Sequence, residues 1–244
     1  MTILALDTSL GALSVAVATG EPVRIVGRLE RREKGHAEAL FPMIEAVLAE
    51  AGVAAKSIRR IAVTEGPGGF TSVRIAIAAA RGLALATGAD TVTTSGLHLM
   101  ALEAADQLRG EIAPEAGLVA AVDARRDEVY VQRFDATGNP LGQPRVVALT
   151  HVDDFLVARG TIVVGSGAAL VAAAAQRYTC RAMLAEIVPD ARRLASIAAG
   201  LVPVIKARPL YLRPPDARPQ TDARTAGGTT GPIDRPAPAS EPEC

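Results

Sequence analysis

Two stretches of this sequence follow one pattern, and together they decide the fold. Residues 2–17 read TILALDTSLGALSVAV, and residues 118–131 read LVAAVDARRDEVYV. In each stretch a short apolar run ends at an aspartate, Asp7 or Asp123, and a second apolar run begins six residues later. Short apolar runs of this kind are typical of β-strands, so each stretch predicts a hairpin whose first strand ends in an aspartate.

The similarity continues beyond the two hairpins. A turn with glycine and proline follows each hairpin and leads to a third strand, and a helical segment comes next, at 36–51 in the first copy and 152–159 in the second. Each copy then has a strand, a glycine turn and an Ala-rich helix, with the strands at 61–64 and 161–164. This shared order of elements predicts a duplicated α/β unit.

The repeat also gives the domain organisation. We expect a first lobe at 1–107 and a second lobe at 108–213, because glycine and proline interrupt the pattern between 105 and 115. Residues 214–244 are rich in Pro, Thr, Asp, Arg and Gly and have almost no bulky apolar side chain. Such a composition cannot offset the entropy of ordering, so we expect a disordered tail.

Composition and charge exclude several classes of protein. The 26 Lys and Arg residues cancel the 26 Asp and Glu residues, so the chain lacks a broad attraction to phosphate backbones, and we expect any RNA contact to be shared with a partner. Two isolated cysteines, Cys180 and Cys244, give no disulfide framework. We expect a cytoplasmic protein without a membrane span, since no signal peptide is recognisable and the longest uncharged run, 160–176, is too short.

The two hairpins and the two glycine turns outline a possible phosphate cleft. An aspartate at a strand end can hold a magnesium-bound phosphate, and a glycine turn before a helix can bind an anion. The alternative is structural: Asp7 closes an Asx turn, and the glycines let a helix approach the sheet. Against the phosphate interpretation, the bulky Arg125 and Arg126 follow Asp123. The candidate residues are Asp7, Thr8, Ser9, Gly66, Gly68, Gly69, Asp123, Gly165 and Gly167.

The helix expected at 72–87 indicates a binding surface. It carries apolar or small residues on nearly every face, so it should be either buried or covered by a partner. The helix at 36–51 has an apolar stripe that ordinary packing on the sheet also explains. The candidate interface residues on the two helices are Leu40, Met43, Ile44, Val47, Arg74, Ala76, Ile77, Ala80 and Leu83.

No set of catalytic or metal-binding residues stands out. The three histidines, His36, His98 and His151, are never three or four positions apart, so a helical two-histidine metal site is absent from the sequence. No serine lies in a Gly-x-Ser-x-Gly motif. We therefore predict neither catalytic residues nor a metal site.

Four motifs resemble those of the TsaB family, also called YeaZ. They are LALDTS at 4–9, EGPGGFTSVRI at 65–75, DARRDEVY at 123–130 and PLYLR at 209–213, in that order along the chain. The glycine loop departs from the family pattern in two places, with Gly69 where the family usually has Ser and Ser72 where it usually has Gly.

This resemblance implies a fold and a function. The implied fold is two tandem lobes of the actin, sugar kinase and heat-shock ATPase type, which is ribonuclease H-like, each lobe a mixed sheet with helices. The implied function is a non-catalytic role in forming threonylcarbamoyladenosine next to the anticodon of tRNAs. In the family TsaB pairs with the transferase TsaD through first-lobe helices, the ATPase TsaE joins them, and tRNA is reached through the complex. ATP and magnesium belong to the assembled complex.

The sequence also bears on metal binding, on self-association and on alternative functions. TsaD carries a metal-binding histidine pair where this chain has only His98. A homodimer is expected when TsaD is absent, because an exposed apolar face tends to be covered. Two alternatives stay open: a small-molecule kinase or ATPase that uses Asp7, Asp123 and the glycine turns, and a glycoprotease-like metalloprotein, which the missing metal ligands disfavour.

Overall fold

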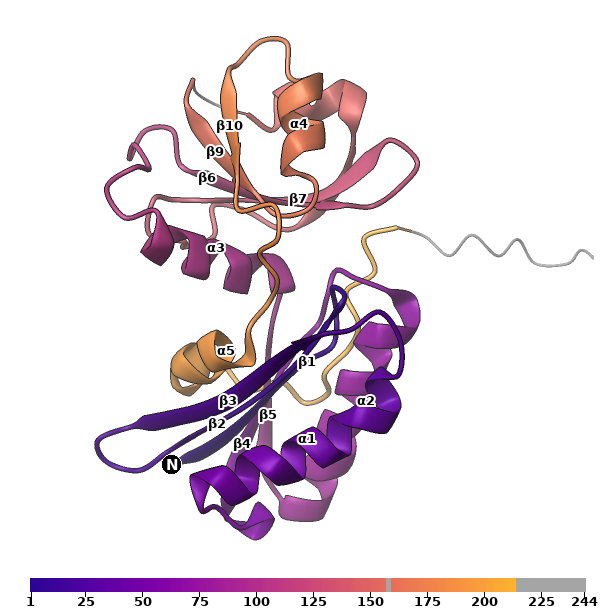
Figure 1. Cartoon of the computed structure of the whole chain (residues 1–244), viewed down its shortest axis with the longest axis vertical. Coiled ribbons are helices and arrows are strands. Elements are labelled where there is room, and N and C mark those ends of the chain that lie inside the picture. The colour runs from indigo at the N-terminus through magenta and orange to yellow at the C-terminus, as the bar shows by residue number, and fades with distance from the viewer. Residues whose placement is uncertain (157–158, 214–244) are drawn as a thin grey trace, which may run out of the picture. The chain divides into compact units, whose positions relative to one another are not determined.

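The structure is a computed structural model that describes residues 1–156 and 159–213 (Figure 1). Met1–Arg213 forms one compact unit. It contains two five-stranded sheets with helices packed on them. The tail expected at 214–244 lies outside the described residues.

The first sheet has the order β3-β2-β1-β4-β5. Strands β1, β2 and β3 form an antiparallel meander, and β4 and β5 continue the sheet in parallel with β1. The strands are β1 (Thr2–Asp7), β2 (Ala12–Thr19), β3 (Arg24–Arg31), β4 (Ile58–Thr64) and β5 (Asp90–Thr94), and the helices between them are α1 (His36–Ala51), the 3-10 helix η1 (Ala55–Ser57) and α2 (Phe70–Thr87).

The second sheet repeats this topology, with the order β8-β7-β6-β9-β10. Strands β6, β7 and β8 form the meander, and β9 and β10 run parallel to β6. The strands are β6 (Leu118–Asp123), β7 (Glu128–Phe134), β8 (Arg145–Ala148), β9 (Thr161–Val164) and β10 (Cys180–Met183). The duplication is therefore confirmed, and each copy is a mixed five-stranded sheet with helices, as the resemblance implied.

The second copy differs from the first in its helical segments. Where the sequence predicted a helical segment at 152–159, the structure has a short 3-10 helix, η2 (Leu149–Asp154). The carboxylate of Asp153 accepts hydrogen bonds from the backbone amides of Gln176 and Arg177, at 3.0 Å each, which ties this segment to the chain after α4 (Ala168–Ala174). The element of the second copy that corresponds to α1 is thus only six residues long.

Alternation of side chains along each strand decides on which face of the sheet each side chain lies. In β1, Leu4 and Leu6 join the cluster that packs against α1 and α2, whereas Ile3 and Ala5 join the cluster on the opposite face. Side chains alternate between faces along a strand, so one strand contributes to both cores. All four residues are at most 4% exposed.

Two helices pack against the sheet of the other copy. Helix α3 (Gly96–Gln107) follows β5 in sequence, but its Met100 and Ala104 pack with Leu118 and Phe134 of the second sheet. Conversely, α5 (Ala191–Ile197) comes after β10 and covers the first sheet, followed by the 3-10 helix η3 (Ala198–Gly200). The two sheets therefore exchange their covering helices, and the boundary expected at 107 stays a prediction.

Candidate functional site

Asp7 ends β1 and is completely buried. One carboxylate oxygen accepts a hydrogen bond from the amide of Ser9 (3.1 Å), and the other accepts one from the Ser9 hydroxyl (2.8 Å). The hydroxyl of Thr64, at the end of β4, donates to this second oxygen as well. This is the Asx turn of the structural interpretation, extended by a contact to the neighbouring parallel strand.

Burial changes the acidity of this group. Loss of hydration raises the pKa of Asp7 from its ordinary value of 3.8 to about 6, although the hydrogen bonds from Thr64 and Ser9 act in the opposite direction. The charge of Asp190 adds to the increase. Desolvation therefore outweighs the three hydrogen bonds, and the carboxyl group titrates near neutral pH.

The first glycine turn packs directly on this hairpin. The amide of Gly69 donates to the carbonyl oxygen of Ser9 (3.2 Å), and the hydroxyl of Thr8 donates to the carbonyl oxygen of Ser72 (2.5 Å). A Cβ atom on Gly68 would overlap the backbone of Ser9. Gly68 is thus required for a close backbone approach, which is the structural role that the sequence left open.

The second hairpin is arranged differently. The side chain of Asp123 is 29% exposed and accepts a hydrogen bond from the amide of Arg125 (2.7 Å). Arg125, Arg126 and Asp127 all have left-handed backbone conformations, with φ values of 63°, 57° and 56°. Three consecutive non-glycine residues in this region are costly, so the turn holds backbone strain.

The second glycine turn is also closely packed. The amide of Gly167 donates to the carbonyl oxygen of Ala121 (3.1 Å), and the hydroxyl oxygen of Ser166 accepts from the amide of Asp123 (3.2 Å). Gly165 has a φ of 96° and leaves no room for a Cβ beside Ala121. Both glycine turns therefore serve hairpin packing in the same way.

The residues of the first hairpin do not fit a magnesium-bound nucleotide in this conformation. Asp7, Thr8 and Ser9 are at most 2% exposed, and both Asp7 oxygens already accept hydrogen bonds from the protein. A divalent cation needs oxygen ligands that it can reach. The phosphate role of the nine cleft residues therefore stays a prediction.

The histidine that follows β5 is part of the packing. His98 lies in the first turn of α3, where Nδ1 is 2.9 Å from the hydroxyl of Thr94 and the ring stacks on Phe134 at 6.0 Å. Burial lowers the pKa of His98. Within residues 1–156 and 159–213, no group of three or more His, Cys, Asp or Glu side chains is placed to hold a metal ion.

The structure places most of the predicted interface residues in the core. Most of them face the sheet and belong to the first core, because the apolar stripe of each helix is the side that packs on the strands. These buried residues, each at most 6% exposed, are Leu40, Met43, Ile44, Val47, Ala76, Ile77 and Ala80. Only Arg74 and Leu83 of the predicted set reach the surface.

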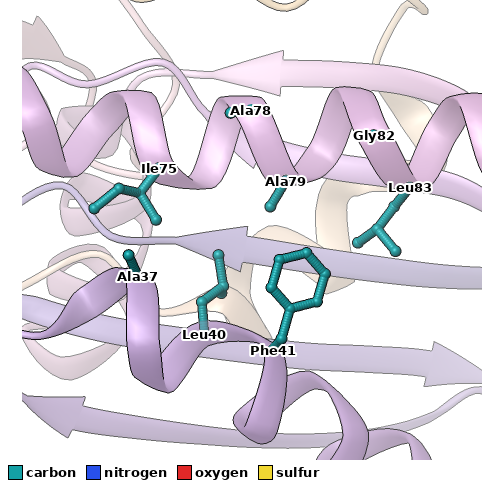
Figure 2. A pocket seen from close by; sticks show the side chains of 8 residues that line it. All are labelled: Ala37, Leu40, Phe41, Ile75, Ala78, Ala79, Gly82 and Leu83. Carbon is teal, nitrogen blue, oxygen red and sulfur yellow. The ribbon is translucent and has the colours of Figure 1, made fainter.

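An apolar groove lies between α1 and α2, on the outer side of the same helices (Figure 2). It has a volume of about 580 Å³. Figure 2 shows Phe41 and Leu40 on α1 opposite Ile75, Ala79 and Leu83 on α2. The full lining is Ala37, Leu40, Phe41, Ile75, Ala78, Ala79, Gly82 and Leu83, which we call the α1–α2 groove.

Helix α2 is unusually apolar on its outer side. Within the described part of the chain it is the one helix long and apolar enough to cross a membrane by length and composition, with a mean hydropathy of 1.3 over 18 residues, of which 28% are buried. In the structure it packs on β4, and Ala78 and Leu85 point away from the core, with Leu85 89% exposed. The outer side of α2 is therefore an uncovered apolar surface.

The predicted interface set contains two residues of the groove, Leu40 and Leu83, and misses the others. Phe41 is 49% exposed, and it lies beside the apolar stripe of α1 rather than in it. Ala78, Gly82 and Leu85 were part of the general observation that the helix is apolar all round. Hydrophobic residues outside a regular stripe were the signal that could have identified them.

Comparison with known proteins shows which proteins this chain resembles. The family model described as TsaD, tRNA N6-adenosine threonylcarbamoyltransferase, matches residues 30–188, which is more than half of the chain. A tRNA threonylcarbamoyladenosine biosynthesis protein TsaB from Haemophilus influenzae is 37% identical over 131 residues, 53% of this chain and 52% of that protein. The TsaB protein of Escherichia coli is 36% identical over 139 residues, 57% of each chain. The chain thus spans about half the length of these curated relatives.

Solved structures match over a greater length. The crystal structure of YeaZ from Pseudomonas aeruginosa is 33% identical, with a TM-score of 0.73, and the match covers 86% of this chain and 99% of that chain. A second Pseudomonas aeruginosa structure, described as similar to peptidase YEAZ, gives 34% identity and a TM-score of 0.74 over 87% and 99% of the two chains. The chain therefore belongs to the TsaB (YeaZ) family.

Proposed function

We propose that this protein is a non-catalytic subunit required for threonylcarbamoyl modification of the adenosine next to the anticodon of tRNAs. It acts by binding and supporting the transferase TsaD, together with the ATPase TsaE. The observation that carries the proposal is the uncovered α1–α2 groove in a chain of the TsaB family. The names of its relatives, TsaB proteins of tRNA threonylcarbamoyladenosine biosynthesis, supply the pathway.

The composition of the groove supports a protein partner. Its lining contains no charged residue, and the ring of Phe41 is half exposed at its edge. Protein interfaces commonly have an apolar centre with a buried aromatic anchor, and a partner helix would fill a groove between two helices. The proposed partner is TsaD, which would cover Phe41, Ala78 and Leu85. TsaE and tRNA then join through the complex, in the cytoplasm.

The buried first hairpin supports a non-catalytic role. A kinase or ATPase would need the carboxylate of Asp7 to reach a metal-bound phosphate, but in the structure Ser9 and Thr64 take up its oxygens. No specific observation favours the glycoprotease alternative. We therefore propose that ATP and magnesium act in the assembled complex rather than in this chain alone.

The experiment tests the groove in cells that depend on this protein. The double variant Ala78→Glu/Leu85→Lys places charges on the outer side of α2, where both side chains are exposed and the fold should tolerate them. We expect the variant to lose co-purification with TsaD and the cells to lose threonylcarbamoyladenosine, measured by mass spectrometry of tRNA nucleosides. Unfolding curves of the purified variant check that it remains folded.

The control is Leu170→Lys on α4, an exposed leucine that lies away from the groove. This variant should retain both co-purification and the modified nucleoside. If the folded groove variant keeps TsaD and the nucleoside level of the wild type, docking through the groove is wrong. If depletion of the whole protein leaves the nucleoside unchanged, the pathway itself is wrong.

A further inference from the structure

The segment that follows η3 packs along the flank of α2 opposite to the groove. We call residues 201–213 the strap, which Figure 1 shows in gold beside α2. The guanidinium group of Arg81 donates to the carbonyl oxygen of Ala207, with Nε at 2.8 Å. The amide of Leu210 donates to the carbonyl oxygen of Glu65 (2.7 Å). The strap is thus fixed to α2 and to the segment before it by directed contacts.

Two aromatic rings meet at one end of the strap. Phe70 begins α2 and is 58% exposed, and Tyr211 of the strap is 53% exposed. Their ring centroids are 6.0 Å apart with an angle of 29° between the planes. The guanidinium carbon of Arg74 lies 3.4 Å from the centroid of Phe70, and its Nε donates to the hydroxyl of Tyr211 (2.7 Å). The rings are therefore held in place while a large part of each stays open to solvent.

The same region is rich in basic side chains. Helix α2 and the strap carry five basic side chains and no acidic one, although the whole chain has a net charge of zero. These residues are Arg74, Arg81, Lys206, Arg208 and Arg213. Lys206 and Arg208 are exposed, whereas Arg213 is paired with Glu128 and Arg81 with the strap carbonyl. A local basic surface thus exists in a neutral protein.

We propose that Phe70 and Tyr211, with Arg74, Lys206 and Arg208, form a contact site for single-stranded RNA. An unpaired base would stack on an aromatic ring, and the two strap cations would neutralise neighbouring phosphates. Single-stranded RNA is commonly recognised in this way, by stacking on aromatic and guanidinium planes within a basic surface. The proposal rests on the proposed function, because a base next to an anticodon lies in a single-stranded loop.

An acidic protein fits the site less well. A protein partner would use a continuous apolar centre, which the other flank of α2 provides in the α1–α2 groove. The strap flank instead offers two flat rings and separated cations, which match the alternation of bases and phosphates along a strand. Since Arg74 fixes both rings before any ligand arrives, a base would meet a preorganised surface.

The test measures binding of a fluorescein-labelled, unmodified tRNA transcript by fluorescence anisotropy, with the full chain alone and in complex with TsaD. The double variant Phe70→Leu/Tyr211→Leu keeps apolar side chains but removes both rings, and we expect the dissociation constant to rise about tenfold or more. Tyr211→Phe keeps the ring but loses the hydroxyl that accepts from Arg74, so its dissociation constant should lie between those of the wild type and the double variant. Lys206→Gln/Arg208→Gln should lower the slope of log affinity against log salt by about 1 to 2.

The control for charge is Lys56→Gln/Arg59→Gln, which removes two exposed cations outside the strap and should leave the slope unchanged. The inference is overturned if the wild type binds no transcript in either form, if the double ring variant binds as tightly as the wild type, or if polyglutamate competes as well as RNA does. A ring variant that releases TsaD but keeps its affinity for RNA would assign the patch to protein docking. That result rejects the RNA site and leaves the proposed function intact.

Discussion

The amide of Gly69 donates a hydrogen bond to the carbonyl oxygen of Ser9 across 3.2 Å, which joins the glycine turn to the first hairpin. Gly68, one residue earlier, lies so close to Ser9 that a Cβ would overlap its backbone. The two glycines of this turn are therefore not equivalent, and this difference gives the first prediction.

Gly68→Ala should destabilise the protein by about 2 kcal/mol or more, because a rigid backbone has to move to admit the methyl group. Gly69→Ala is the matched control, since its Cβ would meet only the side chain of Ser72, with the hydroxyl oxygen at 3.1 Å. Urea unfolding followed by circular dichroism measures both. Equal midpoints for the two variants would contradict the close approach at Gly68.

Asp7 should make stability depend on pH. Its pKa is raised from 3.8 to about 6 in the folded protein, so the folded state retains a proton that the unfolded chain loses between these values. The stabilisation is complete below pH 3.8 and is lost as pH rises through about 6. The loss amounts to about 3 kcal/mol for a shift of this size.

Asp7→Asn removes this titration. Between pH 4 and pH 7 the wild type should therefore lose stability relative to the variant. Urea unfolding at several pH values measures it. Asp154→Asn, at an exposed position, serves as the control for a general change in charge. A difference between wild type and Asp7→Asn that stays constant with pH would show that Asp7 does not titrate in this range.

Arg60 should be an anchor for the chain after α5. Its guanidinium group forms a two-point ion pair with Asp90 at 2.9 and 2.8 Å, and Nη1 donates to the carbonyl oxygen of Ala198 (2.8 Å). Arg60→Met would leave these carbonyl and carboxylate groups without their donor and should cost about 2–3 kcal/mol. Thermal unfolding of this variant beside Arg59→Met, an exposed neighbour, tests the anchor; similar losses in both would refute it.

The uncovered apolar side of α2, which includes Leu85, should also control self-association. Without TsaD, we expect the full chain to form a homodimer that covers this surface, because exposed apolar patches favour association. Leu85→Lys should shift the mass measured by light scattering from dimer to monomer, while Leu170→Lys should not. Addition of TsaD to the wild type should likewise dissociate the dimer. If the dimer persists while TsaD is bound, the dimer contact and the TsaD contact lie on different surfaces.

The sheets could be predicted from sequence because their signals are local. Apolar side chains that alternate with a period of two and are followed by a turn identify a hairpin. The same pattern in the second copy supported the prediction for the first. Helix α1 and strand β9 have the bounds that the sequence predicted, 36–51 and 161–164. The left-handed run from Arg125 to Asp127 gave no such signal, since none of these residues is a glycine.

Most of the predicted interface residues are buried for a physical reason. A regular apolar stripe such as Leu40, Ile44 and Val47 is what packing on a sheet requires, so it is buried in the fold. The exposed apolar side chains lie beside the stripe, at residues such as Phe41 and Leu85. The sequence shows which residues share a helix face, but the sheet decides which face remains open.

The exchange of α3 and α5 has a consequence for synthesis on the ribosome. One face of the first sheet, with Ile3 and Ala16, is covered by Leu194 and Ala195 of α5. Those residues are made only after the ten strands of the described chain. The nascent first sheet therefore waits, with one apolar face uncovered, until nearly the whole described chain has been translated. The two halves of this duplicated protein must complete their folding together, although domains made in sequence usually fold one after the other.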